Sequence, residues 1–517
     1  MLFQQVNRAA KSTNYTLSAP IGGLNARDSL DTMGALDAIV MDNYIPLDTR
    51  VALRKGFVNY VTTDHPVPTL AEYKSTAGNK FLAVSNGKCY NITTKSSVVE
   101  YDAIFTNSRC QTVQYKDRLF FMNGADTPKV FYLGDNNTEI LEDWGFSGTN
   151  LTATKIIAGA VSKNFLWFIE RDTLKVWYSA TAGNISGTLN AFDLSGIARL
   201  GGKLVAVACW TQDGGQGIDD LTVFITSEGE ALVYAGINPN SADSWILKGS
   251  YRISKPIGYN CTMQYQGDII VISEDGYIPL SRALPKDKAN ASQVSFSDKI
   301  RGLVLDRTQT NKDKKGWQGI LYGRGGYAIF NVPSDNQYEQ HVINVNTGAW
   351  CRFTNIRSMC WCIFKDRIYF GSDKGVYLFD EGYSDDGMYI AGNIEQAFSN
   401  LGTPNLKKIQ LLNPRTKSST RYALVIYTNM DFEEQNISYI QNIGNAGMTK
   451  WNEAKWSCLA NPIGTKWATL KGKARSQWIA NSATGFKASI VFKTKTKGNL
   501  IEWFDTGIRF EQGTGII

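Results

Sequence analysis

Histidine is almost absent from this sequence: His65 and His341 are the two among 517 residues. Histidine is the usual general base of enzymes, because its charge changes most easily near neutral pH. Each of the two stands alone in sequence typical of a loop. The chain carries no HExxH, GxSxG or phosphate-binding loop motif, and no set of nucleophile, base and orienting residue can be named. We therefore expect a protein that is not an enzyme.

Cysteines and long apolar runs are also scarce. The eight cysteines are spread along the chain, which is typical of reduced thiols in a protein that folds in a cytoplasm. Cys360 and Cys362 are the one close pair, but a zinc site needs two further ligands and none is evident. We expect two small core residues there, with no metal and no cofactor. No run of about 18 apolar residues exists, and residues 1–20 lack the apolar core of a secretory signal, so we expect neither a membrane span nor a signal peptide.

Aromatic residues and glycine are abundant, at 12% and 47 residues, which suits short strands joined by tight turns. One string occurs twice, as YKDRLFF at 115–121 and as FKDRIYF at 364–370. Both copies open a strand–turn–strand pattern. Looser copies of the pattern cover 79–92, 162–179, 221–236, 265–281 and 325–353.

Each copy has the alternation and the turn residues of a β-hairpin. The copies start about 48 residues apart on average, and a propeller blade of four short strands needs a similar length. A parallel β-helix would have shorter coils, and a sandwich would lack this period. The sequence thus predicts an all-β fold with a β-propeller of six or seven blades.

The flanking segments differ from the repeats, so we expect three domains: an N-terminal arm at 1–60, the propeller at 61–390 and a small C-terminal β domain at 391–517. The arm is expected to be extended, with one short helix or turn and a strand at 50–57. In the C-terminal part, strands are expected at 422–430, 487–497 and 502–510. Residues 401–517 hold 16 Lys or Arg and 7 Asp or Glu, whereas residues 1–400 hold 38 and 40, so the C-terminal domain is the basic one.

Two charged groups suggest possible sites. Lys493, Lys495 and Lys497 alternate along a predicted strand and would share one face, which together with Lys487 predicts a basic patch. This patch suits either contact with a polyanion or a solvated face that blocks aggregation. The Asp385–Asp386–Gly387 cluster does not have the spacing of an EF-hand, and we expect solvated loop acids there.

The arm has a pattern of turn and polar residues. It comprises Gly22, Gly23, Asn25, Arg27, Asp28, Asp37, Asp42, Asn43, Pro46 and Arg54. This pattern resembles the opening of virion proteins of short-tailed bacteriophages. The C-terminal part is similar to the same group in its Asp431–Phe432 pair and its Trp451–Trp456 box, which is followed by Trp467.

The resemblance implies a tail nozzle or tail hub protein, in which six copies form a ring below the tail adaptor. The expected partners are further copies of the chain, the adaptor proteins and the tail fibres. Genomic DNA would pass through the channel without sequence-specific binding, and the protein would assemble in the host cytoplasm into the virion. A dense basic lining would hold DNA rather than let it slide, so we expect the Lys493–Lys497 face to point away from the lumen. The arm residues are expected at an assembly interface.

Two other functions fit the repeats. One is a carbohydrate-binding or glycan-cleaving propeller, such as a receptor-binding or depolymerase component, which would have a deep pocket with paired carboxylates and exposed aromatics. Trp167, Trp177 and Trp361 are its candidate aromatics, although their strand positions favour core packing. The other is a cytoplasmic propeller scaffold of a bacterium.

Overall fold

The structure is a computed structural model that describes residues 12–213, 218–283, 295–335, 338–420, 422–434, 441–443 and 473–513. The chain folds as two compact units. One unit comprises residues 1–58, 342–354 and 380–517, and the other comprises residues 59–341 and 355–379. We call the first the sandwich unit and the second the propeller unit.

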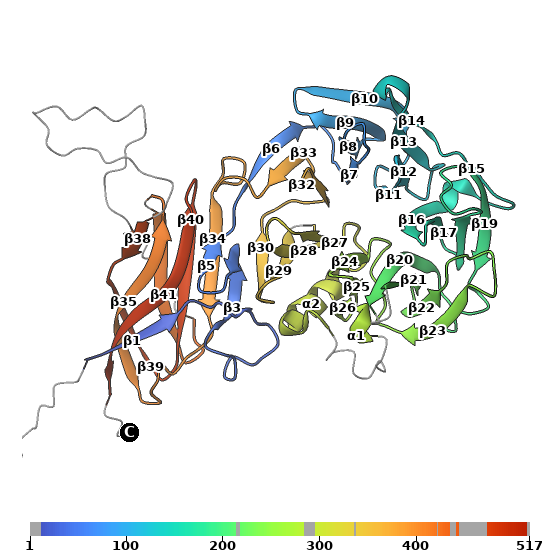
Figure 1. The fold of residues 1–517 in the computed structure, drawn as a ribbon. Helices are drawn as coiled ribbons and strands as arrows, with labels where there is room; N and C mark the ends of the chain where they lie inside the picture. The colour runs from blue at the N-terminus through green and yellow to red at the C-terminus, as the bar shows by residue number, and fades with distance from the viewer. Residues whose placement is uncertain are drawn as a thin grey trace, which may run out of the picture. The chain divides into compact units, whose positions relative to one another are not determined.

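Six small sheets form blades of a β-propeller in the propeller unit, so the predicted fold class is confirmed (Figure 1). In chain order, the strands of the first five are β7 (Thr69–Tyr73), β8 (Lys80–Ser85), β9 (Lys88–Thr94) and β10 (Ser97–Ile104); β11 (Gln111–Tyr115), β12 (Arg118–Met122), β13 (Lys129–Leu133) and β14 (Glu139–Asp143); β15 (Phe146–Ser147), β16 (Ile156–Ser162), β17 (Phe165–Glu170), β18 (Lys175–Ser179) and β19 (Gly187–Asp193); β20 (Leu204–Asp213), β21 (Ile218–Thr226), β22 (Glu230–Ala235) and β23 (Ile246–Arg252); and β24 (Thr262–Tyr265), β25 (Asp268–Ser273) and β26 (Gly276–Pro279).

The last blade closes the ring with a strand from the start of the unit. Its order is β31 (Cys360–Phe364), β32 (Arg367–Ser372), β33 (Gly375–Phe379) and β6 (Phe57–Thr62). Between the fifth blade and this one the chain forms α1 (Leu280–Ala283), α2 (Arg301–Asn311), β27 (Gln318–Tyr322), β28 (Tyr327–Val332) and β29 (Glu339–Asn344). The boundary between the two units falls inside β29.

The innermost strands contact one another around the ring. The contacting pairs are β7 with β11, β11 with β16, β16 with β20, β24 with β27, β27 with β31, and β31 with β7, while β20 contacts β25 of the next blade. β27 therefore occupies a place of its own between the fifth and last blades. The next two strands of the chain, β28 and β29, lie within the sixth copy of the sequence repeat, at 325–353.

In the four-stranded blades, the repeated hairpins of the sequence are the middle two strands. The copies at 79–92, 162–179 and 364–380 are β8–β9, β17–β18 and β32–β33. The residues before these hairpins make the tight turns, where Lys163 and Asn164, and likewise Lys365 and Asp366, have positive φ. Two successive residues with positive φ match the right-handed twist of the flanking strands, which is why polar residues recur there.

Aromatic side chains fill the space between neighbouring blades. Trp167 of β17 is fully buried and lies 5.5 Å from Trp245, 5.4 Å from Phe224 and 5.1 Å from Tyr178, measured between ring centroids. Trp177 is likewise buried. These two tryptophans, candidates for sugar stacking in the sequence, belong to the core between blades.

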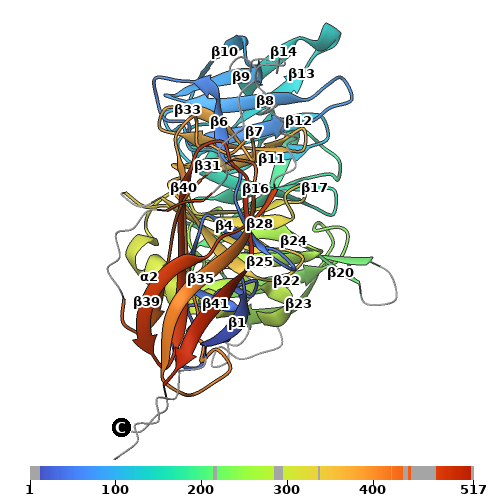
Figure 2. The same ribbon diagram turned by 90° about the vertical axis from the view of Figure 1, so that its left-hand side faces the viewer.

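The sandwich unit consists of two sheets whose facing sides share a core (Figure 2). The strands of one are β1 (Ser12–Ser18), β4 (Tyr44–Pro46), β5 (Val51–Leu53), β35 (Lys407–Ser418), β38 (Lys473–Ser476), β39 (Ile479–Gly485) and β41 (Ile501–Gln512). The strands that the other contributes to this unit are β2 (Gly23–Leu24), β3 (Asp37–Asp42), β30 (Trp350–Thr354), β34 (Ile390–Gln396), β36 (Tyr422–Met430), β37 (Gln441–Ile443) and β40 (Ala488–Thr496). Phe492 of β40 stacks on Trp503 of β41 at 4.5 Å, so the two sheets meet face to face.

The predicted C-terminal strands match β36, β40 and β41 closely, because each is rich in β-branched and aromatic residues. The arm differs in part from its prediction. Residues 37–42 form β3, the arm contains turns between residues 21 and 36 as one expected alternative, and the expected strand at 50–57 is divided into β5 and the start of β6. The arm and the C-terminal segment, expected as separate domains, belong to one unit, and residues 342–354, expected in the propeller, belong to that unit too. Within the described residues, no helix is long and apolar enough to cross a membrane.

Trp167→Ala tests the packing between blades. Removing this fully buried ring should lower the free energy of unfolding by about 3–5 kcal/mol, because the site cannot collapse between three aromatic neighbours. Denaturant unfolding followed by tryptophan fluorescence and circular dichroism measures the change. Trp478→Ala, at a tryptophan that is 47% exposed, should change the free energy by less than about 1 kcal/mol. Equal losses in the two variants would contradict the described core.

Candidate functional site

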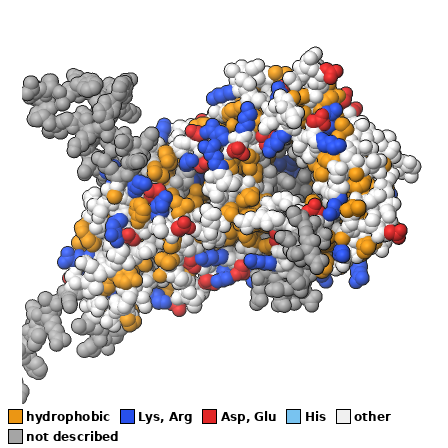
Figure 3. Space-filling view, in the orientation of Figure 1, with side chains coloured by type: hydrophobic (Ala, Val, Ile, Leu, Met, Phe, Trp, Pro, Cys, Tyr) orange, Lys and Arg blue, Asp and Glu red, His pale blue; other side chains and the backbone are white. Residues whose placement is uncertain are grey.

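A cavity of about 690 Å³ lies at the centre of the propeller unit. Its walls come from the innermost strands β7, β11, β16, β27 and β31 and from the loops that lead into them. The innermost strands ring the axis, so their side chains cannot fill it completely. Figure 3 shows a hollow in this part of the molecule with Lys and Arg side chains in it.

Lys and Arg predominate among the charged residues of the cavity. Six of them line it, namely Arg109, Arg171, Lys203, Lys312, Lys314 and Lys315, against the three acids Glu72, Asp172 and Asp313. Four of these cations have carboxylate partners: Arg171 and Lys203 share Asp172, at 3.4 and 3.0 Å, and Lys312 and Lys314 pair with acids outside the lining. Arg109 and Lys315 are the two lining cations that have no carboxylate partner among the described residues, and they give the lining an excess of positive charge.

Three cysteines also border the cavity: Cys110, Cys360 and Cys362. Burial raises the pKa of the Cys360 thiol to about 11 and raises the pKa values of the other two as well. Thiols with raised pKa values are protonated at neutral pH and are poor nucleophiles. No cluster of His, Cys, Asp or Glu that suits a metal ion occurs in the part of the chain that the structure describes.

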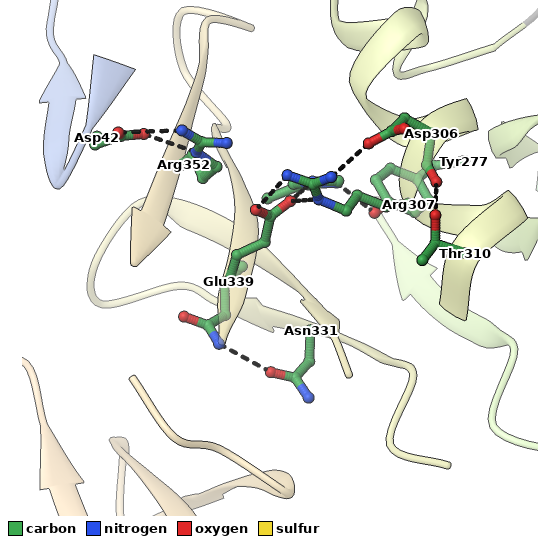
Figure 4. Close-up of polar contacts among 10 residues, drawn as sticks. Asp42, Tyr277, Asp306, Arg307, Thr310, Asn331, Glu339 and Arg352 are labelled. Carbon is green, nitrogen blue, oxygen red and sulfur yellow. Dashed lines mark hydrogen bonds and ion pairs between the residues drawn. The ribbon is translucent and has the colours of Figure 1, made fainter. Parts of the chain in front are cut away.

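His341, expected in a loop, is instead a fully buried residue of β29. Its Nε2 lies 2.9 Å from a Glu339 oxygen, and its Nδ1 lies 2.8 Å from the hydroxyl of Tyr277, whose pKa burial raises far above its usual value. Arg307 of α2 reaches the same Glu339 at 2.9 Å (Figure 4). The set resembles a nucleophile, a base and an orienting acid. Tyr277 and His341 have no exposed surface, so a substrate cannot reach them. The network instead joins α2 to β26 and β29 through hydrogen bonds.

The glycines and the first polar residues of the arm pattern form a turn within the sandwich unit. Gly23 has φ +79°, and a Cβ there would lie 2.5 Å from the Trp350 carbonyl oxygen. At Gly22 a Cβ would lie 2.2 Å from an oxygen of Asp37. Asn25 is buried and donates to Asp37 at 2.9 Å. Glycine is therefore needed at 22 and 23, because a side chain would clash with Asp37 or with the backbone of Trp350.

Asn25 also donates to Asp28 at 2.9 Å, and its Oδ1 accepts the backbone N–H groups of Arg27 and Asp28 at 3.1 Å. Arg27 pairs with Asp28 at 2.7 Å, and its side chain is 47% exposed. Arg27 is thus the member of this turn that presents most of its surface to solvent.

The remaining residues of the pattern make buried polar contacts in the same unit. The fully buried Arg54 donates two parallel hydrogen bonds to Asp385, at 2.8 and 2.7 Å. Its Nε donates to the Oδ1 of Asn43 at 2.8 Å. Asn43, at φ +60°, donates in turn to the carbonyl of Ala391 at 2.7 Å. Asp385, expected to be a solvated loop acid, is therefore a buried partner of the arm.

Asp42 and Pro46 have partners on neighbouring strands. Asp42 accepts two bonds from Arg352 at 2.7 and 3.1 Å (Figure 4), and the Pro46 carbonyl accepts one from Asn344 at 2.8 Å. Nearly all of the arm pattern is thus used inside the sandwich unit. Asn25, Asn43 and Arg54 have almost no surface left for another chain.

The predicted basic patch lies on β40 and beside it. Lys493 and Lys495 are exposed, while Thr494 and Thr496 between them are buried, as the alternation predicts. Lys493 lies over the Tyr427 ring and Lys495 over the Tyr389 ring, at 5.7 and 5.5 Å from the ring centres. Lys497 is exposed after the strand, and Lys487 pairs with Asp31 before it.

Sequence reasoning missed the cavity, because its lining is brought together from strands and turns far apart in the chain, including Asn123 and Arg171 from the turns of two repeated hairpins. The sequence repeat gave one signal for the cavity, because a propeller places its inner strands around a central axis. The Trp451–Trp456 box and Trp467 lie outside the described residues.

The geometry defines an all-β protein with a propeller. No protein-family model matches the chain, and no curated protein matches it. Among solved structures it is similar to a computationally designed protein, Ika8, with 12% identity and a TM-score of 0.34 over 62% of this chain and 99% of that one. It is also similar to a Bacteroides fragilis protein assigned as a 6-phosphogluconolactonase, with 11% identity and a TM-score of 0.36 over 65% of this chain and 91% of that one.

Arg54→Ala tests the buried ion pair. The change strands the Asp385 carboxylate without its cation, and we expect the free energy of unfolding to fall by about 3–5 kcal/mol. Arg27→Ala is the matched control, since both pairs span 2.7 Å but the Arg54 side chain is 1% exposed and that of Arg27 is 47% exposed. The control should lose less than about 1 kcal/mol. Urea unfolding measures the free energy of unfolding of both variants. Similar losses in the two would show that burial does not set the strength of the ion pair.

Proposed function

We propose that this chain is a structural virion protein, the nozzle or hub subunit of a short phage tail, and that it is not an enzyme. The observation that carries the proposal is the arm pattern from Gly22 to Arg54, which resembles the opening of such proteins. In this proposal six copies form a ring that docks to the tail adaptor and to fibres. DNA leaves through the ring, and the exposed Lys493–Lys497 face points away from that channel.

Exposed apolar residues support a role in assembly. On β10, the outermost strand of its blade, Val98 and Val99 are 45% exposed and Ile104 is 77% exposed. Sheet edges with exposed apolar side chains are surfaces on which other chains dock. The buried arm residues, by contrast, serve the proposal by fixing the shape of the sandwich unit rather than by touching a partner.

The cavity gives the glycan-cleaving alternative little support. Such an enzyme needs two carboxylates facing one bond, with one of them as the proton donor. Glu72 and Asp172 of the lining instead lie 3.0 Å from the ammonium groups of Lys74 and Lys203. Trp361 borders the cavity, but its ring is buried.

Electron microscopy of the purified chain, alone and with a tail adaptor ring, tests the proposal. We expect rings with sixfold symmetry, at least in the presence of the adaptor, and Ile104→Asp should reduce ring formation if β10 lies at a contact between copies. Thr494→Ser, at a buried position of the sandwich unit, is the control and should leave ring formation unchanged. A chain that stays monomeric, does not bind the adaptor ring and cleaves a surface glycan would overturn the proposal.

A further inference from the structure

Arg109 is a cation of the propeller cavity that has no carboxylate partner among the described residues. Its Nη1 donates to the Met359 carbonyl at 3.1 Å, the one hydrogen bond that its guanidinium makes within those residues. Its Nε and Nη2 thus have donors to spare. Arg109 is partly buried, and this burial lowers the pKa of its guanidinium.

A desolvated cation without an anion is costly, and proteins retain one where something else supplies the negative charge. Gly316 lies beside Arg109, since a Cβ added at this glycine would lie 3.9 Å from the Nη2. Lys315 precedes this glycine, lines the same cavity and also has no acid partner among the residues described. The two uncompensated cations therefore come from the loop before β11 and from the loop before β27.

We propose that this cavity binds a small phosphate monoester, with Arg109 as the principal phosphate ligand and Lys315 as the second positive charge. The planar guanidinium presents parallel N–H donors that match two oxygens of one phosphate. Arg109 and Lys315 are the two lining cations without a carboxylate partner among the described residues, and two positive charges favour a doubly charged group over a single carboxylate. The volume of about 690 Å³ suits a small organic molecule, and the amides of Gln111 and Asn260 border the space where hydroxyl groups would lie.

Isothermal titration calorimetry of the full chain, in a phosphate-free buffer of low ionic strength, tests the site with three probes: glycerol 3-phosphate, inorganic phosphate and glycerol. We expect the first two to bind and glycerol not to bind. Binding of glycerol 3-phosphate more tightly than inorganic phosphate identifies an organic phosphate as the ligand class. Arg109→Met should weaken glycerol 3-phosphate at least about 10-fold, since a charge-assisted hydrogen bond contributes about 1.5–3 kcal/mol. The affinity of Arg109→Lys for glycerol 3-phosphate should lie between those of the unaltered chain and Arg109→Met. Lysine keeps the positive charge but lacks the parallel N–H donors of the guanidinium.

Arg252→Met is the matched control, because it removes the same charge from an exposed position at the end of β23, outside the cavity lining. It should bind glycerol 3-phosphate like the unaltered chain. Failure of both phosphates to bind, equal binding of glycerol, or equal weakening by Arg252→Met would overturn the proposal. If circular dichroism shows that Arg109→Met is unfolded, Arg109→Lys and Lys315→Met decide, and unchanged affinity in both rejects the site. None of these outcomes depends on ring formation. The calorimetry can therefore reject the phosphate site without rejecting the proposed tail role, and the reverse also holds.

Discussion

One strand closes the propeller ring. β6 is the outer strand of the last blade, and the next strand of the chain, β7, is the innermost strand of the first. The ring of Tyr60 on β6 lies 5.1 Å from Tyr369 of the last blade and 6.1 Å from Phe81 of the first, and Phe81 stacks on Phe364 at 4.8 Å. The first and last blades are therefore joined by backbone pairing, by aromatic packing and by the chain itself. Separating any two blades elsewhere strains this junction, because a closed ring has no free end.

The central cavity follows from the same closure. Apolar side chains between blades hold the innermost strands at a fixed distance from the axis, so the strands cannot approach one another to fill the middle. The unit thus has two interiors of different chemistry, an aromatic one between blades and a polar one along the axis. Polar and charged groups such as Arg109 are retained in the second, where they contribute nothing to the packing between blades.

Features that depend on local sequence were predictable, and those that depend on contacts distant in the chain were not. The hairpins β12–β13 and β32–β33 follow from alternation and turn residues within about 20 positions, and so do β36, β40 and β41. The capture of β6 by the last blade depends on a partner about 300 residues away. Likewise, nothing in the neighbourhood of Asp385 indicates that it is buried against Arg54, which lies 331 residues away in the chain. The cavity was missed for the same reason, since its lining is assembled from innermost strands that lie far apart in the chain.

The arm pattern shows how a family resemblance and an internal constraint coincide. Arg54, Asn43 and Asp385 satisfy one another far from water, and replacing any of them strands a polar group. Lysine cannot take the place of Arg54, because a single ammonium group cannot make parallel bonds to a carboxylate and reach an amide oxygen as well. Such a set keeps its spacing because its members depend on one another. The pattern therefore identifies how the sandwich unit is built, and any surface for another chain would lie among exposed residues, such as those of β10.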